Sequence, residues 1–278
     1  MTVKLSITMS ASHVLARHQN CLLENPMLRS LKPLPLTLAI AALCLITTGC
    51  GSSSTQVRVI NAMYNTNGPG VNVEFNSAQT FTTAIQFGSI LPAISSPPAA
   101  TYTSVPSGTD TIQVFNAGST TDPIVTNNLP LDSGEQYTLV LAPDIVTPFV
   151  DDNTAPASGS DLVEVRVIDA STAGPLVDVY LIPCGENISS TYKIGTIIYP
   201  NYINYDSVAF NSNSCPGGSD NYEFEVFEEN STANPFVNQY YNLSVGSITT
   251  LVLLDNVQGD QLSGLQPSPI PLVLYDLD

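Results

Sequence analysis

The chain has 278 residues and a formal net charge of −17, from 24 acidic residues against 7 Lys and Arg. This balance excludes nucleic-acid binding, because contacts to phosphates need clustered Lys and Arg. Both histidines, His13 and His18, lie near the N-terminus, and the chain has no Trp. From residue 50 onward no histidine is left for a catalytic triad or a transition-metal site, and no glycine motif cradles phosphate. We expect a protein that is not an enzyme and that binds no cofactor and no metal.

Residues 27–49 have the pattern of a signal peptide. Arg29 and Lys32 precede an apolar run at residues 36–46, which is too short to cross a bilayer and fits the central region of a secretory signal. Residues 1–26 fit no signal. We therefore expect translation to begin at Met27, with residues 1–26 as an extension of the gene model. Initiation at Met1, with a long leader that is later removed, is the alternative.

The signal ends in Thr47-Thr48-Gly49-Cys50, which resembles the lipobox of bacterial lipoproteins. In a lipobox the cysteine is acylated and becomes the first mature residue, so we predict lipidation of Cys50 and a tether at residues 50–55. The acyl chains anchor the protein to the membrane of the cell envelope. Gly51 follows the cysteine where an Asp would retain the protein, and this favours the outer membrane. The alternative is ordinary cleavage, which leaves Cys50 as a free thiol.

The rest of the chain contains an internal duplication. The motif VRVINA at residues 57–62 returns as VRVIDA at residues 165–170, and each copy continues with a Gly-Pro turn and a short alternating strand. The repeat is about 110 residues long, which is the size of a domain and not of a solenoid repeat. We predict one domain at 56–150, a linker at 151–161 and a second domain at 162–278.

Apolar residues alternate with polar ones inside each copy, which is typical of half-buried strands. Val71, Val73 and Phe75 alternate with Asn72 and Glu74, and the strands end in Pro, Gly, Asn and Ser. No segment after Cys50 has a sustained helical period. The predicted fold is all-β, with two tandem antiparallel β-sandwich domains of immunoglobulin-like architecture.

Four sequence features together resemble a known family. They are the VRVI-(N/D)-A opening, the V-x-V strand after a proline turn, the LxxGxxYTLVL segment from Leu131 to Leu141, and DDNTAP at residues 151–156. They resemble the bacterial domain-of-unknown-function family 4397, in two copies over residues 56–278. The resemblance implies an exported, β-rich protein without an assigned activity. The second copy departs from the pattern, because residues 243–249 lack the tyrosine.

Cys184 and Cys215 are the cysteines that remain after the lipobox, and they lie 31 residues apart. In an exported protein they are expected to form a disulfide. A thiol active site or a metal pair is the competing interpretation, but CxxC spacing and a histidine partner are both missing.

Arg58 and Arg166 occupy equivalent positions of the repeat and are two of the three cations after residue 50, with Lys193. A repeated clamp for an anion is one interpretation. We favour an exposed strand arginine paired with a cross-strand acid, such as Asp178 beside Arg166, which would contribute about 0–1 kcal/mol.

Acidic loop residues offer a second kind of candidate site. Calcium takes six to eight oxygen ligands, which inter-domain loops can supply, but no EF-hand loop or RTX-type repeat is present. Solvated loops are the favoured interpretation of these residues, which are Asp144, Asp151, Asp152, Asp255 and Asp260.

Carboxylates and tyrosines supply the last candidates. Glu223 and Glu225 share one strand face, as a hydrolytic pair would, and an aromatic platform for sugar is available from Tyr192, Tyr199, Tyr202 and Tyr205. We predict a non-enzymatic envelope lipoprotein that acts as a surface binding or structural module. Its partner, a glycan or an envelope protein, would meet the outer sheet faces or loop tips of the second domain. A carboxylate-based polysaccharide hydrolase, or a glycan-binding protein, is the alternative.

Overall fold

The computed structural model describes residues 54–63, 70–79, 81, 83–93, 100–154, 156–157, 159–172, 174–255 and 269–277. The predicted signal peptide, Cys50 and most of the tether lie outside the described residues. No described helix has the length and apolar character needed to cross a membrane. Residues from Ser52 to Asp278 form one compact unit.

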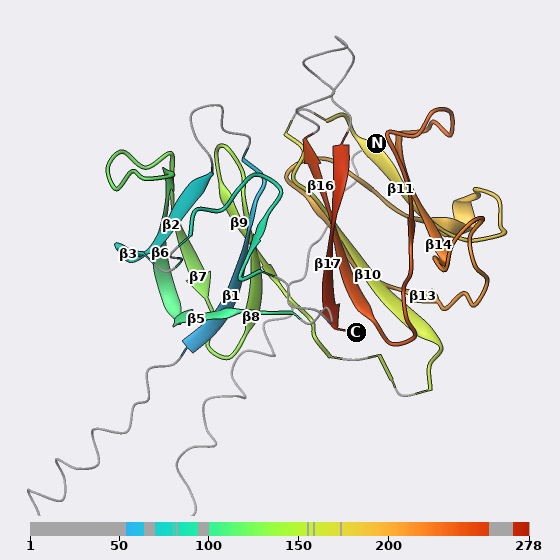
Figure 1. Cartoon of the computed structure of the whole chain (residues 1–278), viewed down its shortest axis with the longest axis horizontal. Coiled ribbons are helices and arrows are strands. Elements are labelled where there is room, and N and C mark those ends of the chain that lie inside the picture. The colour runs from blue at the N-terminus through green and yellow to red at the C-terminus, as the bar shows by residue number, and fades with distance from the viewer. Residues whose placement is uncertain are drawn as a thin grey trace, which may run out of the picture. The chain divides into compact units, whose positions relative to one another are not determined.

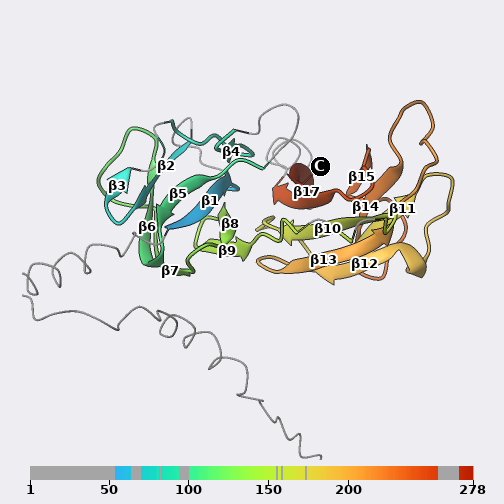
Figure 2. The same ribbon diagram turned by 90° about the horizontal axis from the view of Figure 1, so that it is seen from below.

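The first half of this unit contains two sheets, which we call the first sheet pair (Figure 1). One sheet has the order β4-β1-β8-β9, with β5 also paired to β1, and the other has the order β3-β2-β6-β7. In Figure 2, β2, β3 and β6 lie apart from β1, β8 and β9. The strands are β1 (Ser54–Asn61), β2 (Val71–Phe75), β3 (Ala78–Gln79), β4 (Ile90–Leu91), β5 (Thr103–Pro106), β6 (Gly108–Asn116), β7 (Val125–Leu131), β8 (Gln136–Leu141) and β9 (Val146–Val150).

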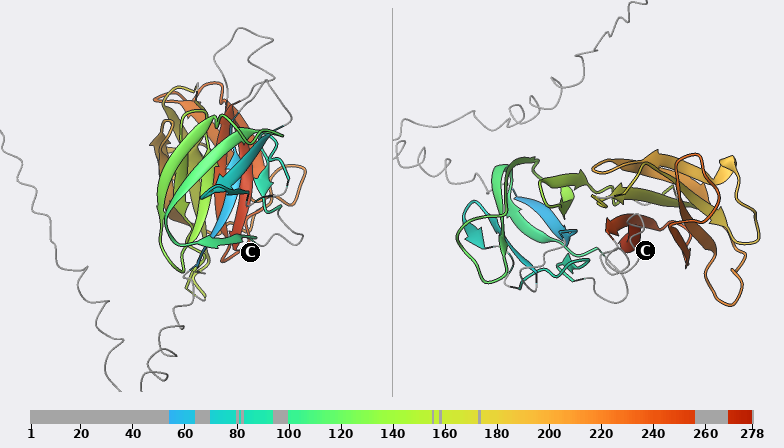
Figure 3. Two further views of the ribbon diagram at one scale, coloured as in Figure 1. Left: turned by 90° about the vertical axis from the view of Figure 1, so that its left-hand side faces the viewer. Right: turned by 90° about the horizontal axis from the view of Figure 1, so that it is seen from above.

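The second half repeats this plan as the second sheet pair, with the orders β13-β10-β16-β17 and β12-β11-β14-β15. The described residues contain no α-helix, and η1 (Ser190–Tyr192) is a single 3₁₀ turn. Figure 3 shows the strands from two further sides. The strands are β10 (Leu162–Asp169), β11 (Val177–Pro183), β12 (Lys193–Ile197), β13 (Tyr202–Ala209), β14 (Tyr222–Glu228), β15 (Val237–Tyr241), β16 (Ile248–Asp255) and β17 (Pro269–Leu277).

The all-β prediction is confirmed, but the expectation of purely antiparallel sheets is wrong. β1 pairs with β8 in parallel, and β10 pairs with β16 in parallel. A parallel pair needs a long connection that returns the chain to the same end of the sheet. Strands β2 to β7 provide this connection in the first sheet pair, and β11 to β15 provide it in the second.

Alternation along the strands builds the core of each sheet pair. Val71, Val73 and Phe75 of β2 are buried, as their period of two predicts, while Asn72 and Glu74 are only partly buried. The core of the first sheet pair contains residues of both its sheets, and so does the core of the second. A third apolar cluster contains residues of both pairs, namely Ile60, Ala62, Val140, Phe149, Ile168, Ala170, Val252 and Leu254.

Candidate functional site

A buried cluster of charges lies immediately after β9. Nη2 of Arg166 lies 2.6 Å from Oδ1 of Asp151, and Nε of Arg58 lies 3.4 Å from Oδ2 of the same carboxylate. The side chains of both arginines are 1% exposed and that of Asp151 is 0% exposed. One carboxylate therefore joins the two arginines that the repeat places at equivalent positions.

Threonines complete the cluster in the same way in both halves. Arg58 lies opposite Thr138 and Arg166 opposite Thr250 in the two parallel strand pairs. Nε of each arginine donates to the threonine hydroxyl, at 2.7 Å in the first half and 3.0 Å in the second. The Thr138 hydroxyl also lies 2.7 and 2.8 Å from the two carboxylate oxygens of Asp151.

The predicted pairing of Arg166 with Asp178 on an exposed face is wrong. Asp178 is paired with Lys193, whose Nζ lies 2.7 Å from Oδ1. Burial tends to raise the pKa of Asp178, but hydrogen bonds from Lys193 and Thr196 outweigh it and hold the pKa below its usual value. Arg166 is buried because Asp151, from the predicted linker at 151–161, covers it. The alternation of apolar and polar residues along a strand does not indicate an ion pair with a linker residue, so the sequence could not predict this contact.

Aromatic rings cover both guanidinium groups. The ring centre of Tyr102 lies 5.3 Å from Arg58 and that of Tyr205 lies 4.6 Å from Arg166, which are cation–π distances. The Tyr102 hydroxyl also donates to Asp151 at 2.9 Å. Sequence reasoning missed Tyr102, Thr138 and Thr250, although the two threonines occupy matching places in the repeat.

A β-bulge in β13 sets the direction of Tyr205. The register with β10 runs from Val167 opposite Ile203 to Val165 opposite Asp206, so two residues of β13 face the single residue Arg166. In a regular strand Tyr205 would share a face with Ile203, which packs against the core of the second sheet pair. The extra residue turns Tyr205 out of the core, which is a recurrent use of bulges beside functional sites.

Tyr205 and Tyr202 consequently line one hollow of about 560 Å³, which we call the aromatic hollow. The Tyr202 side chain is 52% exposed, and its ring packs edge-on against Phe149 with centroids 5.1 Å apart. Polar groups surround the rings. The lining residues are Pro148, Phe149, Val150, Asp152, Glu164, Arg166, Tyr202, Asn204, Tyr205 and Ser207.

The four predicted platform tyrosines separate into different places. Only Tyr202 and Tyr205 meet in the aromatic hollow. The Tyr199 hydroxyl donates to Asp144 at 2.5 Å, and burial followed by this bond raises the pKa of Tyr199 well above its usual value. Tyr192 lines a separate hollow of about 260 Å³ beside Lys193.

The predicted acidic loop residues that the structure describes do not form one cluster, although Asp144 and Asp255 both lie near Tyr199. Asp151 holds the arginines, Asp152 lines the aromatic hollow, and Asp255 accepts hydrogen bonds from Ser171 and Thr172. Asp260 lies outside the described residues. In the part of the chain that the structure describes, no group of three or more His, Cys, Asp or Glu is placed to hold a metal ion.

Glu223 and Glu225 lie on one face of β14, and the Asn238 amide donates to both carboxylates, at 2.8 and 2.9 Å. Burial and the charge of Glu223 raise the pKa of Glu225. Neither carboxylate lines the aromatic hollow. The carboxylates that lie beside the tyrosines in the hollow are those of Asp152 and Glu164. Sequence reasoning did not select these two acids as a pair.

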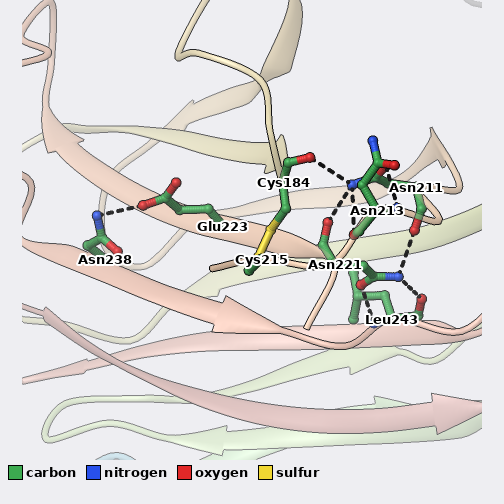
Figure 4. Close-up of a disulfide and its surroundings, with 8 residues drawn as sticks. All are labelled: Cys184, Asn211, Asn213, Cys215, Asn221, Glu223, Asn238 and Leu243. Carbon is green, nitrogen blue, oxygen red and sulfur yellow. Dashed lines mark hydrogen bonds between the residues drawn. A yellow bond between two sulfur atoms is a disulfide. The ribbon is translucent and has the colours of Figure 1, made fainter. Parts of the chain in front are cut away.

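The predicted disulfide between Cys184 and Cys215 is confirmed, and both residues are buried (Figure 4). Two asparagines beside it bond to each other's backbone. Asn221 Nδ2 donates to the carbonyl of Asn211 at 3.0 Å, and Asn211 Nδ2 donates to the carbonyl of Asn221 at 2.8 Å. The bridge and these bonds hold the loop between β13 and β14 against the end of β11.

The tyrosine that the second copy lacks has a structural role in the first. The Tyr137 hydroxyl accepts the backbone N–H of Asp132 at 3.0 Å. Thr249 occupies the equivalent place, and its buried hydroxyl has no partner among the described residues. In the second sheet pair Tyr222, on another strand, accepts from Asn211 N at 2.8 Å and donates to the carbonyl of Ala209 at 2.6 Å.

Replacing Thr249 with valine is expected to raise the free energy of unfolding by about 1 kcal/mol, because it removes a buried, unpaired hydroxyl and keeps the shape. Urea denaturation measures the change. The matched Thr138→Val variant is expected to lower the stability instead, because Thr138 bonds to Arg58 and Asp151. A loss of stability in Thr249→Val would show that its hydroxyl has a partner.

Residues 55–180 match the model of a family described as Domain of unknown function (DUF4397), so the chain contains one domain of this family. The match covers the first sheet pair and continues through β10 into β11. A search of curated proteins finds no match to the chain.

Proposed function

Because the chain carries a domain of this family of unknown function, we propose a role from its geometry: it is a non-enzymatic glycan-binding protein of the cell envelope. The aromatic hollow is the ligand site. The observation that supports the proposal most strongly is the β-bulge that places Tyr205 beside the exposed Tyr202 in a polar hollow.

The lining of the hollow suits a sugar. A tyrosine ring offers an apolar face to the C–H groups of a pyranose while its hydroxyl stays in water. Asn204, Ser207 and Asp152 supply donors and acceptors around the rings, and a few such groups fix the orientation of a ligand. The ring of Tyr202 is held by Phe149 and that of Tyr205 by Arg166, so little side-chain freedom is lost on binding.

The wider proposal concerns the rest of the chain. The protein is exported and anchored to the outer membrane by acylation of Cys50, and each sheet pair is an immunoglobulin-like sandwich. Residues 162–278 are a second, diverged copy of the first domain. The equivalent strand orders of the two sheet pairs and the matched Arg–Thr pairs support this duplication.

Replacing Tyr202 with alanine is expected to weaken glycan binding about fivefold, because the variant loses a stacking surface worth roughly 1 kcal/mol. A glycan array identifies the sugars, and calorimetry on the purified protein measures the affinities. Tyr240→Ala is the control, because Tyr240 is 43% exposed but lies on β15, outside the hollow. Equal affinities for the two variants would refute the site.

One observation favours a second function, a carboxylate-based polysaccharide hydrolase. Asp152 and Glu164 both line the aromatic hollow, and paired carboxylates are the usual machinery of glycoside hydrolysis. The two functions differ in their products. The appearance of new reducing ends when the protein is incubated with the polysaccharide it binds would replace the binding function with the hydrolytic one.

A further inference from the structure

A second hollow of about 680 Å³ adjoins the aromatic hollow, and we call it the amide hollow. Val150 and Asp152 line both hollows, so the two meet at the end of β9. We propose that the ligand is an uncharged polysaccharide chain that runs across Val150 and occupies both hollows. This inference rests on the proposed glycan-binding function. The amide hollow is lined by Ser54, Gln56, Gly134, Glu135, Gln136, Val150, Asp151, Asp152, Asn153 and Thr154.

Hydrogen-bonding groups of the amide hollow are arranged in a connected row. Gln136 Nε2 donates to Gln56 Oε1 at 2.6 Å, and Asn153 Nδ2 donates to Gln136 Oε1 and to the Tyr102 hydroxyl. Side-chain amides present a donor and an acceptor side by side, which matches the hydroxyl groups of a sugar. These hydrogen bonds hold the three side-chain amides in place, and we expect a polysaccharide chain lying across the hollow to bond to them.

One acceptor in this row is unused. Asn153 Oδ1 is buried and has no hydrogen-bond partner among the described residues. A buried polar atom without a partner costs free energy, and a hydroxyl donor from a ligand would remove that cost. Because Asn153 lines the amide hollow, a small turn of its side chain would bring this atom to a sugar hydroxyl next to Asp152.

The charges of the two hollows select against an anionic polymer. Glu135, Asp152 and Glu164 are acidic, and the single lysine or arginine in either lining is Arg166. Asp151 contacts both Arg166, at 2.6 Å, and Arg58, so this buried cluster keeps one positive charge, and the acids Glu135, Asp152 and Glu164 outnumber it. A polyuronate would therefore meet repulsion along the whole path, while an uncharged chain would not.

Exposure at the junction fits a chain that crosses it. Val150 is 53% exposed although its side chain is apolar, and its backbone carbonyl accepts a hydrogen bond from Nη1 of Arg166 at 2.9 Å. Val150 thus forms a fixed apolar ridge with polar walls on both sides, against which the C–H face of a sugar ring can rest. A single sugar bound at Tyr202 would leave this ridge and the amide hollow uncovered.

Calorimetry with cello- and chito-oligosaccharides of two and six units tests the proposal, with a six-unit oligogalacturonate as the anionic probe. We expect at least one neutral six-unit oligomer to bind tenfold or more tightly than its two-unit form, and the oligogalacturonate not to bind. Gln56→Ala is expected to reduce the six-unit affinity and to leave the two-unit affinity unchanged. The matched control is Gln239→Ala, because Gln239 is an exposed glutamine on β15.

The outcomes separate this inference from the proposed function. Equal affinities for two and six units, with binding still lost in Tyr202→Ala, would overturn the extended chain and leave the aromatic hollow as the site. Tight binding of the oligogalacturonate would overturn the selection for an uncharged chain. Failure of every neutral oligomer to bind would overturn the proposed function together with the inference.

Discussion

Replacing Asp151 with alanine is expected to lower the free energy of unfolding by roughly 3–5 kcal/mol, because two buried arginines lose their common carboxylate. Arg58 and Arg166 are both 1% exposed, so water cannot replace the lost partner. Asp151→Asn keeps the shape and an acceptor for Thr138 but removes the charge, and its loss should be intermediate. Urea denaturation, followed by circular dichroism, measures each variant.

The matched control is Lys193→Met, which removes an ion pair of comparable length that is partly exposed. Nζ of Lys193 lies 2.7 Å from Asp178, and the lysine side chain is 29% exposed. The Asp178 side chain is 3% exposed, but it keeps hydrogen bonds from Thr196 and from the Asn230 N–H when the lysine is removed. Such pairs contribute about 0–1 kcal/mol, so this variant should remain close to the parent protein. A loss below about 1 kcal/mol in Asp151→Ala would show that water reaches the arginines.

Asp151 also has consequences for the proposed site. Its neighbours Val150 and Asp152 line both hollows, and the Val150 carbonyl accepts Nη1 of Arg166. The buried cluster therefore holds the backbone from which the ligand-facing side chains project. The Asp151 side chain is 0% exposed, so a variant that stays folded should bind sugar more weakly although the altered side chain does not reach the ligand.

The sequence was sufficient to predict the all-β fold and the disulfide, because these depend on local alternation and on the pairing of cysteines in exported proteins. It was insufficient for the buried arginines. Arg58 has the same period-two context as an exposed strand residue. Its contacts with Thr138, 80 residues away, with Asp151 and with the Tyr102 ring remove it from water.

The aromatic hollow was beyond sequence reasoning for a related reason. Tyr202 and Tyr205 differ by an odd number of residues, which in a regular strand places them on opposite faces. Their common face depends on the register between β10 and β13, where two residues oppose Arg166. Register of this kind is a property of the assembled sheet and not of either strand alone.

The free energy of unfolding is expected to depend on pH through one buried carboxylate. Asp169, at the end of β10, is 3% exposed. Burial raises its pKa from 3.8 to about 6, with a smaller contribution from the charge of Asp255, while backbone N–H groups of Ser171 and Tyr199 oppose the rise. Because the folded pKa lies above the unfolded one, the protonated form stabilises the fold at low pH. This stabilisation is lost as the pH rises through about 6.

A shift of this size corresponds to about 3 kcal/mol. The first sheet pair provides the design of the test, because Asn61 occupies the equivalent position and its Oδ1 accepts Met63 N at 2.8 Å, as Asp169 Oδ1 accepts Ser171 N at 2.9 Å. The stability of Asp169→Asn relative to the parent protein is expected to rise by about 3 kcal/mol between roughly pH 3.5 and pH 7. Urea denaturation across this range measures the difference, and Asp161→Asn, at an exposed acid, is the control. A difference that does not change with pH would mean that the Asp169 carboxylate is solvated well enough to keep its ordinary pKa.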